Sequence, residues 1–319
     1  SGGIAASGGT LSNLNALIAA RNNAGLGTNP NSVLLVSEDA HSSFVKCIRV
    51  MGLDTRNLVR IKTDNQGRMD INDLRNSLDK CSIENKKIFA IVATLGTTVR
   101  GAIDPIKEIS EICKQRNIWL HIDGSIGGIF AITSIPIEGL NNINQANSIT
   151  INPQKIIGIT KTSSLLLVSN MSTLENTFNT GLPYISSKEN IINRGEIGIQ
   201  GSRPAEVIKL WLGLRFLGLK GIENILKSSI KRKDFFVKNI SKNKFDIYSG
   251  PLHIVSFLPN KLEPKDSDEW TQNKVDELIN NNFMLSRPKF KGKYFLRVVM
   301  GNYNTKESHI EELLRLLDA

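Results

Sequence analysis

Three polar features of this chain fit one kind of chemistry when they are taken together. Lys155 lies in a segment of low charge, Asp123 ends an apolar run typical of a strand, and residues 7–10 form a Ser-Gly-Gly-Thr turn before a helix-like segment. A lysine can form an imine with an aldehyde, a carboxylate can keep a pyridine nitrogen protonated, and a helix N-terminus can hold a phosphate. The combination predicts a site for pyridoxal 5'-phosphate (PLP).

Lys155 is the preferred imine-forming residue, although a single lysine is normally a solvated cation. Residues 149–159 carry little charge, and partial burial there is expected to lower the pKa of Lys155 and favour the neutral amine. Lys161 is a competitor in the same part of the chain. Lys155 is favoured over it because Asn152 and Gln154 can donate hydrogen bonds to phosphate oxygens.

Each remaining feature has an ordinary explanation beside the functional one. The turn at residues 7–10 could be a plain helix cap, and Asp123 could be a cap or an ion-pair member. The small residues that follow, 124–128, would let a flat ring approach Asp123 closely. His41 could be a polar turn residue. Its functional alternative is an imidazole that stacks on the cofactor ring and moves protons at the substrate's α-carbon.

Strand-like apolar runs alternate with helix-like segments over the first two thirds of the chain. This pattern predicts an α/β fold with a mostly parallel sheet covered on both faces. Ligands of such sheets bind beyond the C-terminal strand ends, where Asp123 and Lys155 fall. Asp104, just before Pro105, is expected to cap a helix with its carboxylate. Residues 204–217 are apolar nearly all round and are expected to form a helix buried between layers.

The pattern changes near Gly218 to amphipathic helices and short strands. We therefore predict a large PLP-binding domain, residues 1–218, and a small C-terminal α+β domain, residues 219–319.

Composition indicates an ordinary globular protein. Of 319 residues, 40% are hydrophobic and 22% charged. The sequence has no apolar run of membrane-spanning length and no secretion-signal pattern at its start. The three cysteines form no CxxC pair and the four histidines have no zinc spacing, which predicts reduced thiols, a cytoplasmic location and no metal. The net charge of +10 raises the question of nucleic acid, but the basic residues are dispersed, and a solvated surface that also attracts an anionic cofactor or substrate is favoured instead.

The order of these features resembles a known family, the group II PLP-dependent amino-acid decarboxylases, which includes aromatic amino-acid and glutamate decarboxylases. The matching blocks cover almost the whole chain: residues 6–13 (ASGGTLSN), 41–44 (HSSF), 93–98 (ATLGTT), 101–105 (GAIDP), 119–123 (WLHID), 152–155 (NPQK), 209–215 (KLWLGLR) and 296–299 (LRVV). The resemblance implies PLP fold type I, the aspartate-aminotransferase-like architecture, and a homodimer with active sites at the interface.

The resemblance also implies an activity and a set of site residues. The activity is decarboxylation of an L-amino acid to an amine and CO₂, with Lys155 as the internal imine and His41 as the stacking residue, both catalytic. Asp123 would bind the ring nitrogen and Thr98 would lie near the phenolic oxygen. The full set of expected cofactor-binding residues is Ala6, Ser7, Gly8, His41, Thr98, Asp123, Ser125, Asn152, Gln154 and Lys155.

The sequence departs from the family pattern in three places. Gln154 stands where relatives have histidine, and Asp123 is followed by Gly-Ser-Ile rather than Ala-Ala-aromatic. Residues 186–200 contain no tyrosine, the residue that usually reprotonates Cα, and Tyr184 is out of register. This loss could redirect the chemistry to another fold type I reaction (aldehyde-forming, lyase or transaminase-like), or leave a PLP-binding protein without turnover. Relatives also extend further before the phosphate turn, so a fragment, a processed form or a short relative is expected.

Overall fold

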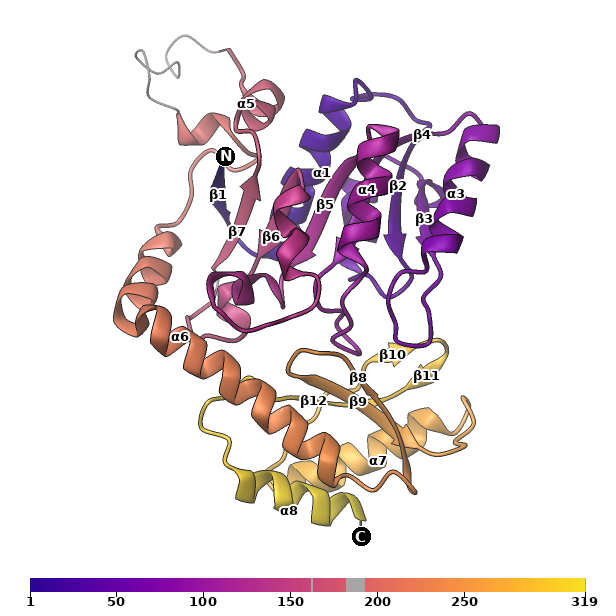
Figure 1. Ribbon diagram of the computed structural model, residues 1–319, viewed down its shortest axis with the longest axis vertical. Helices are drawn as coiled ribbons and strands as arrows, with labels where there is room; N and C mark the ends of the chain where they lie inside the picture. The colour runs from indigo at the N-terminus through magenta and orange to yellow at the C-terminus, as the bar shows by residue number, and fades with distance from the viewer. Residues whose placement is uncertain (162, 182–192, 319) are drawn as a thin grey trace.

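The computed structural model describes residues 1–161, 163–181 and 193–318, and its larger part is built on one seven-stranded sheet (Figure 1). The strand order is β1-β7-β6-β5-β4-β2-β3. Strands β6, β5, β4, β2 and β3 run parallel, and β7 is antiparallel to both β6 and β1. The strands are β1 (Gly2–Ala6), β2 (Ser32–Ser37), β3 (Leu58–Ile61), β4 (Lys87–Thr94), β5 (Trp119–Gly124), β6 (Ser148–Ile151) and β7 (Ser164–Val168).

Helices cover both faces of this sheet, as the continuous apolar strands predict. Leu34 of β2 packs with helices α1 (Gly9–Asn23) and α2 (Ser43–Val50) on one face. Leu35, the next residue, packs with helices α3 (Ile71–Ile83) and α4 (Ile106–Arg116) on the other. A short helix, α5 (Ser172–Phe178), lies beside α1. The predicted α/β class with a mostly parallel sheet is confirmed.

The antiparallel strands β1 and β7 decide where the site can form. Two reversals of direction bring the C-terminal end of β1 to the same edge of the sheet as those of β5 and β6. The turn from β1 into α1 therefore lies beside the strand ends that carry Asp123 and Asn152. Pro153–Lys155 forms a short 3₁₀ turn directly after β6.

A second hydrophobic core lies below the sheet in Figure 1. It contains an antiparallel sheet of order β12-β9-β8, and β10 and β11 pair in a hairpin beside it. Helix α6 (Glu206–Asn239) connects the two cores, since Leu226 packs in the first and Phe236 in the second. The remaining elements are β8 (Phe245–Ser249), β9 (Ile254–Pro259), α7 (Ser267–Asn280), β10 (Lys289–Phe290), β11 (Lys293–Tyr294), β12 (Leu296–Val299) and α8 (Glu307–Asp318).

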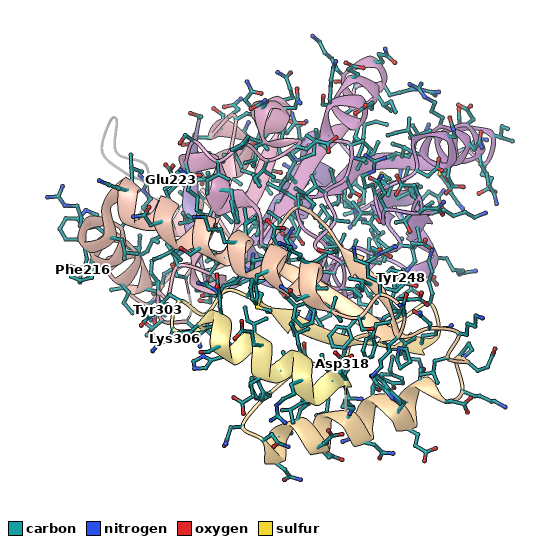
Figure 2. All side chains as sticks on the ribbon, turned by 60° about the horizontal axis from the view of Figure 1, so that its bottom comes forward. Phe216, Glu223, Tyr248, Tyr303, Lys306 and Asp318 are labelled. Atoms are coloured by element: carbon teal, nitrogen blue, oxygen red, sulfur yellow. The ribbon has the colours of Figure 1, made fainter. Side chains whose placement is uncertain are left out.

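Helix α6 departs from the expected pattern in one respect. Gly218 has non-helical angles (φ 61°, ψ 171°), so the helix kinks at the predicted domain boundary and continues past it. The expectation that residues 204–217 are buried between layers is wrong. Trp211 is 60% exposed and Phe216, which projects outward in Figure 2, is 90% exposed. Only the stripe around Leu210 reaches the core, because a helix packed on a single layer buries one side only.

Candidate cofactor site

A cavity of about 190 Å³ opens where strands β4, β5 and β6 end and helix α1 begins. Six of the residues predicted from the sequence line it together. These are His41, Thr98, Asp123, Ser125, Asn152 and Lys155. Lys155 and Asp123 therefore lie on the same side of the molecule, as a shared site requires.

The other four predicted residues lie around this cavity without lining it. Ala6 ends β1, and Gly8 precedes α1 with a φ of 107°. Ser7 is hydrogen-bonded to Gln200, whose amide Nε2 donates to its hydroxyl at 3.0 Å. Gln154 accepts a hydrogen bond from the backbone N–H of Ser163 through Oε1, which leaves its amide nitrogen available as a donor. Their part in phosphate binding stays a prediction.

The Asp123 carboxylate is fixed by two donors. The backbone N–H of Ser125 donates to Oδ1 at 3.1 Å, and the side-chain amide of Asn13 donates to Oδ2 at 3.2 Å. Asp123 is 4% exposed and is the next-to-last residue of the fully buried strand β5. A carboxylate held in this way still has lone pairs free on the cavity side, as a bond from a pyridinium nitrogen requires.

The first turn of α1 provides a place that fits a phosphate group. A Cβ on Gly9 would lie 2.5 Å from Asn152 Nδ2 and 3.0 Å from Ser125 Oγ, so only glycine leaves this space open. Ser164 Oγ donates to Asn152 Oδ1 at 2.5 Å. This bond fixes the orientation of the Asn152 amide and leaves its Nδ2 available to donate to an anion. These side-chain donors, together with backbone N–H groups at a helix N-terminus, suit an anion. The residues present therefore fit PLP.

Lys155 has the electrostatic character expected of an imine-forming amine. Its pKa is lowered, first because the surrounding protein displaces water and second because the Arg297 cation is near, while Asp123 opposes both effects. The Lys155 side chain still reaches solvent through the open cavity. A lowered pKa increases the fraction of neutral amine at a given pH, and the neutral amine is the nucleophile.

His41 lies at the mouth of the cavity, where its side chain is exposed. Its Nδ1 accepts a hydrogen bond from the backbone N–H of Ser43 at 3.1 Å, so the neutral ring carries its hydrogen on Nε2. The pKa of His41 is lowered, first because the surrounding protein removes part of the water around the ring. The Asp123 charge raises this pKa, and the Lys155 and Lys46 cations lower it further. A neutral imidazole with Nε2–H free is suited to stacking and to proton transfer.

Several lining residues were not predicted from the sequence. Asn13 lines the cavity from α1, one helical turn after Gly9, and this i,i+4 spacing is the signal that could have identified it. Ser43 and Thr94 contribute buried hydroxyls that have no partner among the described residues. Nothing in the local sequence distinguishes these two from other buried hydroxyls.

The fold and this cavity together define a class of protein. A mostly parallel sheet, a lysine and a carboxylate beyond its strand ends, and a glycine-shaped cradle at a helix N-terminus are the parts of a fold type I PLP protein. The family model described as the pyridoxal-dependent decarboxylase conserved domain matches residues 1–257. The chain belongs to this family.

Curated relatives and solved structures agree with the assignment. The chain is 29% identical to an aromatic-L-amino-acid decarboxylase of Bacillus atrophaeus, over 99% of the chain and 67% of that protein. It is 30% identical to the acidic amino acid decarboxylase GADL1 of Xenopus tropicalis, over 75% of the chain and 49% of that protein. The chain thus spans about half to two thirds of these relatives. A crystal structure of mouse CSAD superposes with a TM-score of 0.90 at 26% identity, covering 100% of this chain and 71% of that one.

Proposed function

We propose that the protein catalyses PLP-dependent decarboxylation of an L-amino acid to an amine and CO₂. The observation that carries the proposal is that Lys155, Asp123 and the cradle around Gly9 line one cavity. Relatives that act on aromatic and on acidic amino acids both resemble the chain, so the proposal names no side chain for the substrate. A crystal structure of the Catharanthus roseus tryptophan decarboxylase in complex with L-tryptophan, 25% identical with a TM-score of 0.85 over 99% of this chain and 69% of that one, supports an amino acid as the substrate.

The cavity residues that would hold PLP then have separate tasks. Lys155 would supply the amine that holds the cofactor aldehyde, and Asn152 and Ser125 would donate to the phosphate. Asp123 would accept the hydrogen bond of the ring nitrogen. When bound, PLP supplies an electron sink for the pair of electrons left at Cα as CO₂ departs. His41 covers the open side of the cavity and has an Nε2–H that can exchange protons near the substrate.

One feature of the sequence favours a second candidate reaction. Residues 186–200 contain no tyrosine, and the family's usual donor of a proton to Cα is a tyrosine in this stretch. Tyr184 lies outside the described residues. Without that donor, an aldehyde-forming oxidative deamination at the same site, with molecular oxygen as the two-electron oxidant, becomes the alternative. Assays that follow CO₂, amine, aldehyde and ammonia from a panel of L-amino acids separate the two reactions.

The assembly and the location are part of the proposal. We infer a cytoplasmic homodimer with active sites at the interface, as the family resemblance implies. Every helix of the described residues is too short or too polar to cross a membrane. The apolar side chains of Trp211 and Phe216 are open for contact with another surface. Sedimentation of the wild type and of Trp211→Ser would test the dimer, which the substitution should weaken.

A pair of lysine variants tests cofactor binding itself. Lys155→Ala should abolish the visible absorbance that appears when PLP is added to the purified protein. Lys161→Ala is the matched control, because Lys161 is a nearby exposed lysine outside the cavity. It should keep the absorbance and the activity. Retention of the absorbance by Lys155→Ala would refute the assignment.

A further inference from the structure

A line of buried hydrogen bonds leads from the core of the sheet to Asp123. Asn13 Nδ2 donates to Asp123 Oδ2 at 3.2 Å, and Asn13 Oδ1 lies 3.1 Å from His121 Nε2. His121 Nδ1 lies 2.8 Å from Ser148 Oγ, which also accepts a 2.8 Å hydrogen bond from Trp119 Nε1. All five residues are at most 7% exposed. Only Asp123 and Asn13 line the cavity, so the line extends well behind the cofactor site.

Simple chemistry fixes the direction of every bond in this line. A carboxylate oxygen only accepts, so Asn13 must present Nδ2 to Asp123 and Oδ1 to His121. His121 Nε2 must then carry the hydrogen. In a neutral ring Nδ1 is an acceptor, so the Ser148 hydroxyl donates to it, and the indole N–H of Trp119 donates to Ser148 Oγ. The four bonds therefore point the same way, toward the carboxylate, and each polarises the next.

We infer that Asn13, His121 and Ser148 are positioning residues that hold the Asp123 carboxylate in the orientation that the cofactor nitrogen requires. This inference rests on the proposed PLP function. The backbone N–H of Ser125 holds Oδ1 of Asp123 and the line holds Oδ2, so rotation of the carboxylate would break one bond or the other. Such outer contacts commonly determine how well a binding group performs.

The state of His121 is consistent with this role. Complete burial lowers its pKa to about 4, opposed by the nearby Asp123 carboxylate and by a hydrogen bond with the backbone of Ser148. Asp123 is the one charged group that acts on the ring among the described residues. A neutral imidazole with defined donor and acceptor sides can transmit orientation, whereas an imidazolium would donate from both nitrogens.

The test begins with protein that has no cofactor. Two-dimensional ¹H–¹⁵N NMR of the histidine rings should show His121 as the Nε2–H tautomer, with no titration between about pH 5 and 8. Asn13→Ala removes the acceptor of Nε2–H, so the tautomer should change to Nδ1–H, which can donate to Ser148. Ser148→Ala should keep the tautomer and move the Nδ1 resonance.

Cofactor affinity is the second measurement. Asn13→Ala should raise the Kd for PLP roughly tenfold, and the milder Ser148→Ala should raise it severalfold. Thr150→Val is the matched control, because Thr150 is buried on the same strand and its hydroxyl has no partner among the described residues. It should leave the His121 signals and the Kd unchanged. If Asn13→Ala fails to fold, the Kd of Ser148→Ala for PLP alone decides whether the inference holds.

Two results would overturn the inference. One is an Nδ1–H tautomer or an imidazolium in the wild type near neutral pH. The other is wild-type PLP affinity in both Asn13→Ala and Ser148→Ala. Failure of the wild type to bind PLP would instead refute the proposed function. The NMR measurement on the cofactor-free protein would still test the hydrogen-bond directions independently.

Discussion

Arg297 of strand β12 donates a 2.6 Å hydrogen bond from Nη1 to the backbone carbonyl of Thr98, a residue of the cofactor cavity. The next two carbonyls are held as well. Ser256 of β9 donates through its hydroxyl to the carbonyl of Val99, and the backbone N–H of Gly250 donates to the carbonyl of Arg100 at 2.6 Å. Arg297 and Ser256 are partners in the β9–β12 register. One face of the C-terminal sheet and the residue that follows β8 therefore fix three successive peptide groups beside the cavity.

Ser256→Ala is expected to loosen this attachment without emptying the core. Ser256 is fully buried, and its replacement leaves the carbonyl of Val99 without that donor. The free energy of unfolding should fall by about 1–2 kcal/mol. Because Thr98 lies next to the freed peptide, affinity for PLP should also fall, by a few-fold. Urea denaturation and a PLP titration measure the two effects.

A matched control is available on the neighbouring strand. Ser249→Ala removes an exposed hydroxyl of β8 whose one hydrogen bond within the described part of the chain goes to the adjacent Gly250 carbonyl. Stability and PLP affinity of this variant should stay at the wild-type level. Equal losses in Ser249→Ala and Ser256→Ala would mean that the Val99 contact has no special importance.

The lowered pKa of Lys155 predicts the pH dependence of cofactor capture. The neutral amine reacts, so the rate of PLP capture by the cofactor-free protein should rise with pH through the pKa of Lys155. That rise should come at lower pH than for an ordinary lysine, because burial and the Arg297 cation both lower the pKa. Arg297→Gln removes the cation and should move the rise to higher pH. Stopped-flow absorbance measures both profiles; identical profiles would show that Arg297 has no electrostatic effect on Lys155.

The sheet and the grouping of Lys155 and Asp123 at one edge of it could be predicted because each depends on local signals. Continuous apolar runs predicted a mostly parallel sheet, and the rule that ligands bind beyond parallel strand ends placed Asp123 and Lys155 at one edge of it. The cradle at Gly9 was foreseen as a turn before a helix. These inferences needed only the order of residues along the chain.

Other features depend on contacts between distant segments and could not be predicted in this way. Strand β1 is short, begins with two glycines and is defined by its pairing with β7. Asp104 was expected to cap α4, but its carboxylate accepts hydrogen bonds from the backbone N–H groups of Met69 and Thr94, at 2.7 Å each. The contact between Asn13 and His121 joins a helix to a strand far along the sequence.

Asp104 should make stability depend on pH in an unusual direction. Complete burial raises its pKa to about 7, and the nearby Asp39 and Asp64 charges add to the effect. The unfolded chain loses this proton near pH 4, whereas the folded protein keeps it until about pH 7. The folded state therefore binds more protons between these values, and the contribution of Asp104 to the free energy of unfolding falls as pH rises from about 4 to about 7.

The variant Asp104→Asn isolates this contribution, because the amide does not titrate. The difference in unfolding free energy between wild type and variant should decline by up to a few kcal/mol across that pH range and then become constant. Urea denaturation at a series of pH values gives the difference. A difference that rises with pH would show that the hydrogen bonds from the backbone N–H groups of Met69 and Thr94 lower the pKa of Asp104 by more than burial raises it.

Gly9→Ala tests the phosphate cradle by filling it. The added methyl group would lie 2.5 Å from Asn152 Nδ2 and 3.0 Å from Ser125 Oγ, so both side chains must move from the place where an anion would bind. Gly9 is the first residue of α1, where alanine is a good helix former, so the fold should be retained. The Kd for PLP should rise at least roughly tenfold, as the loss of one or two charge-assisted hydrogen bonds implies.

Gly27→Ala is the control, because its added Cβ would lie 4.0 Å from Asn22 Oδ1, an ordinary contact distance. This variant should bind PLP normally. Normal PLP binding by Gly9→Ala would place the phosphate elsewhere.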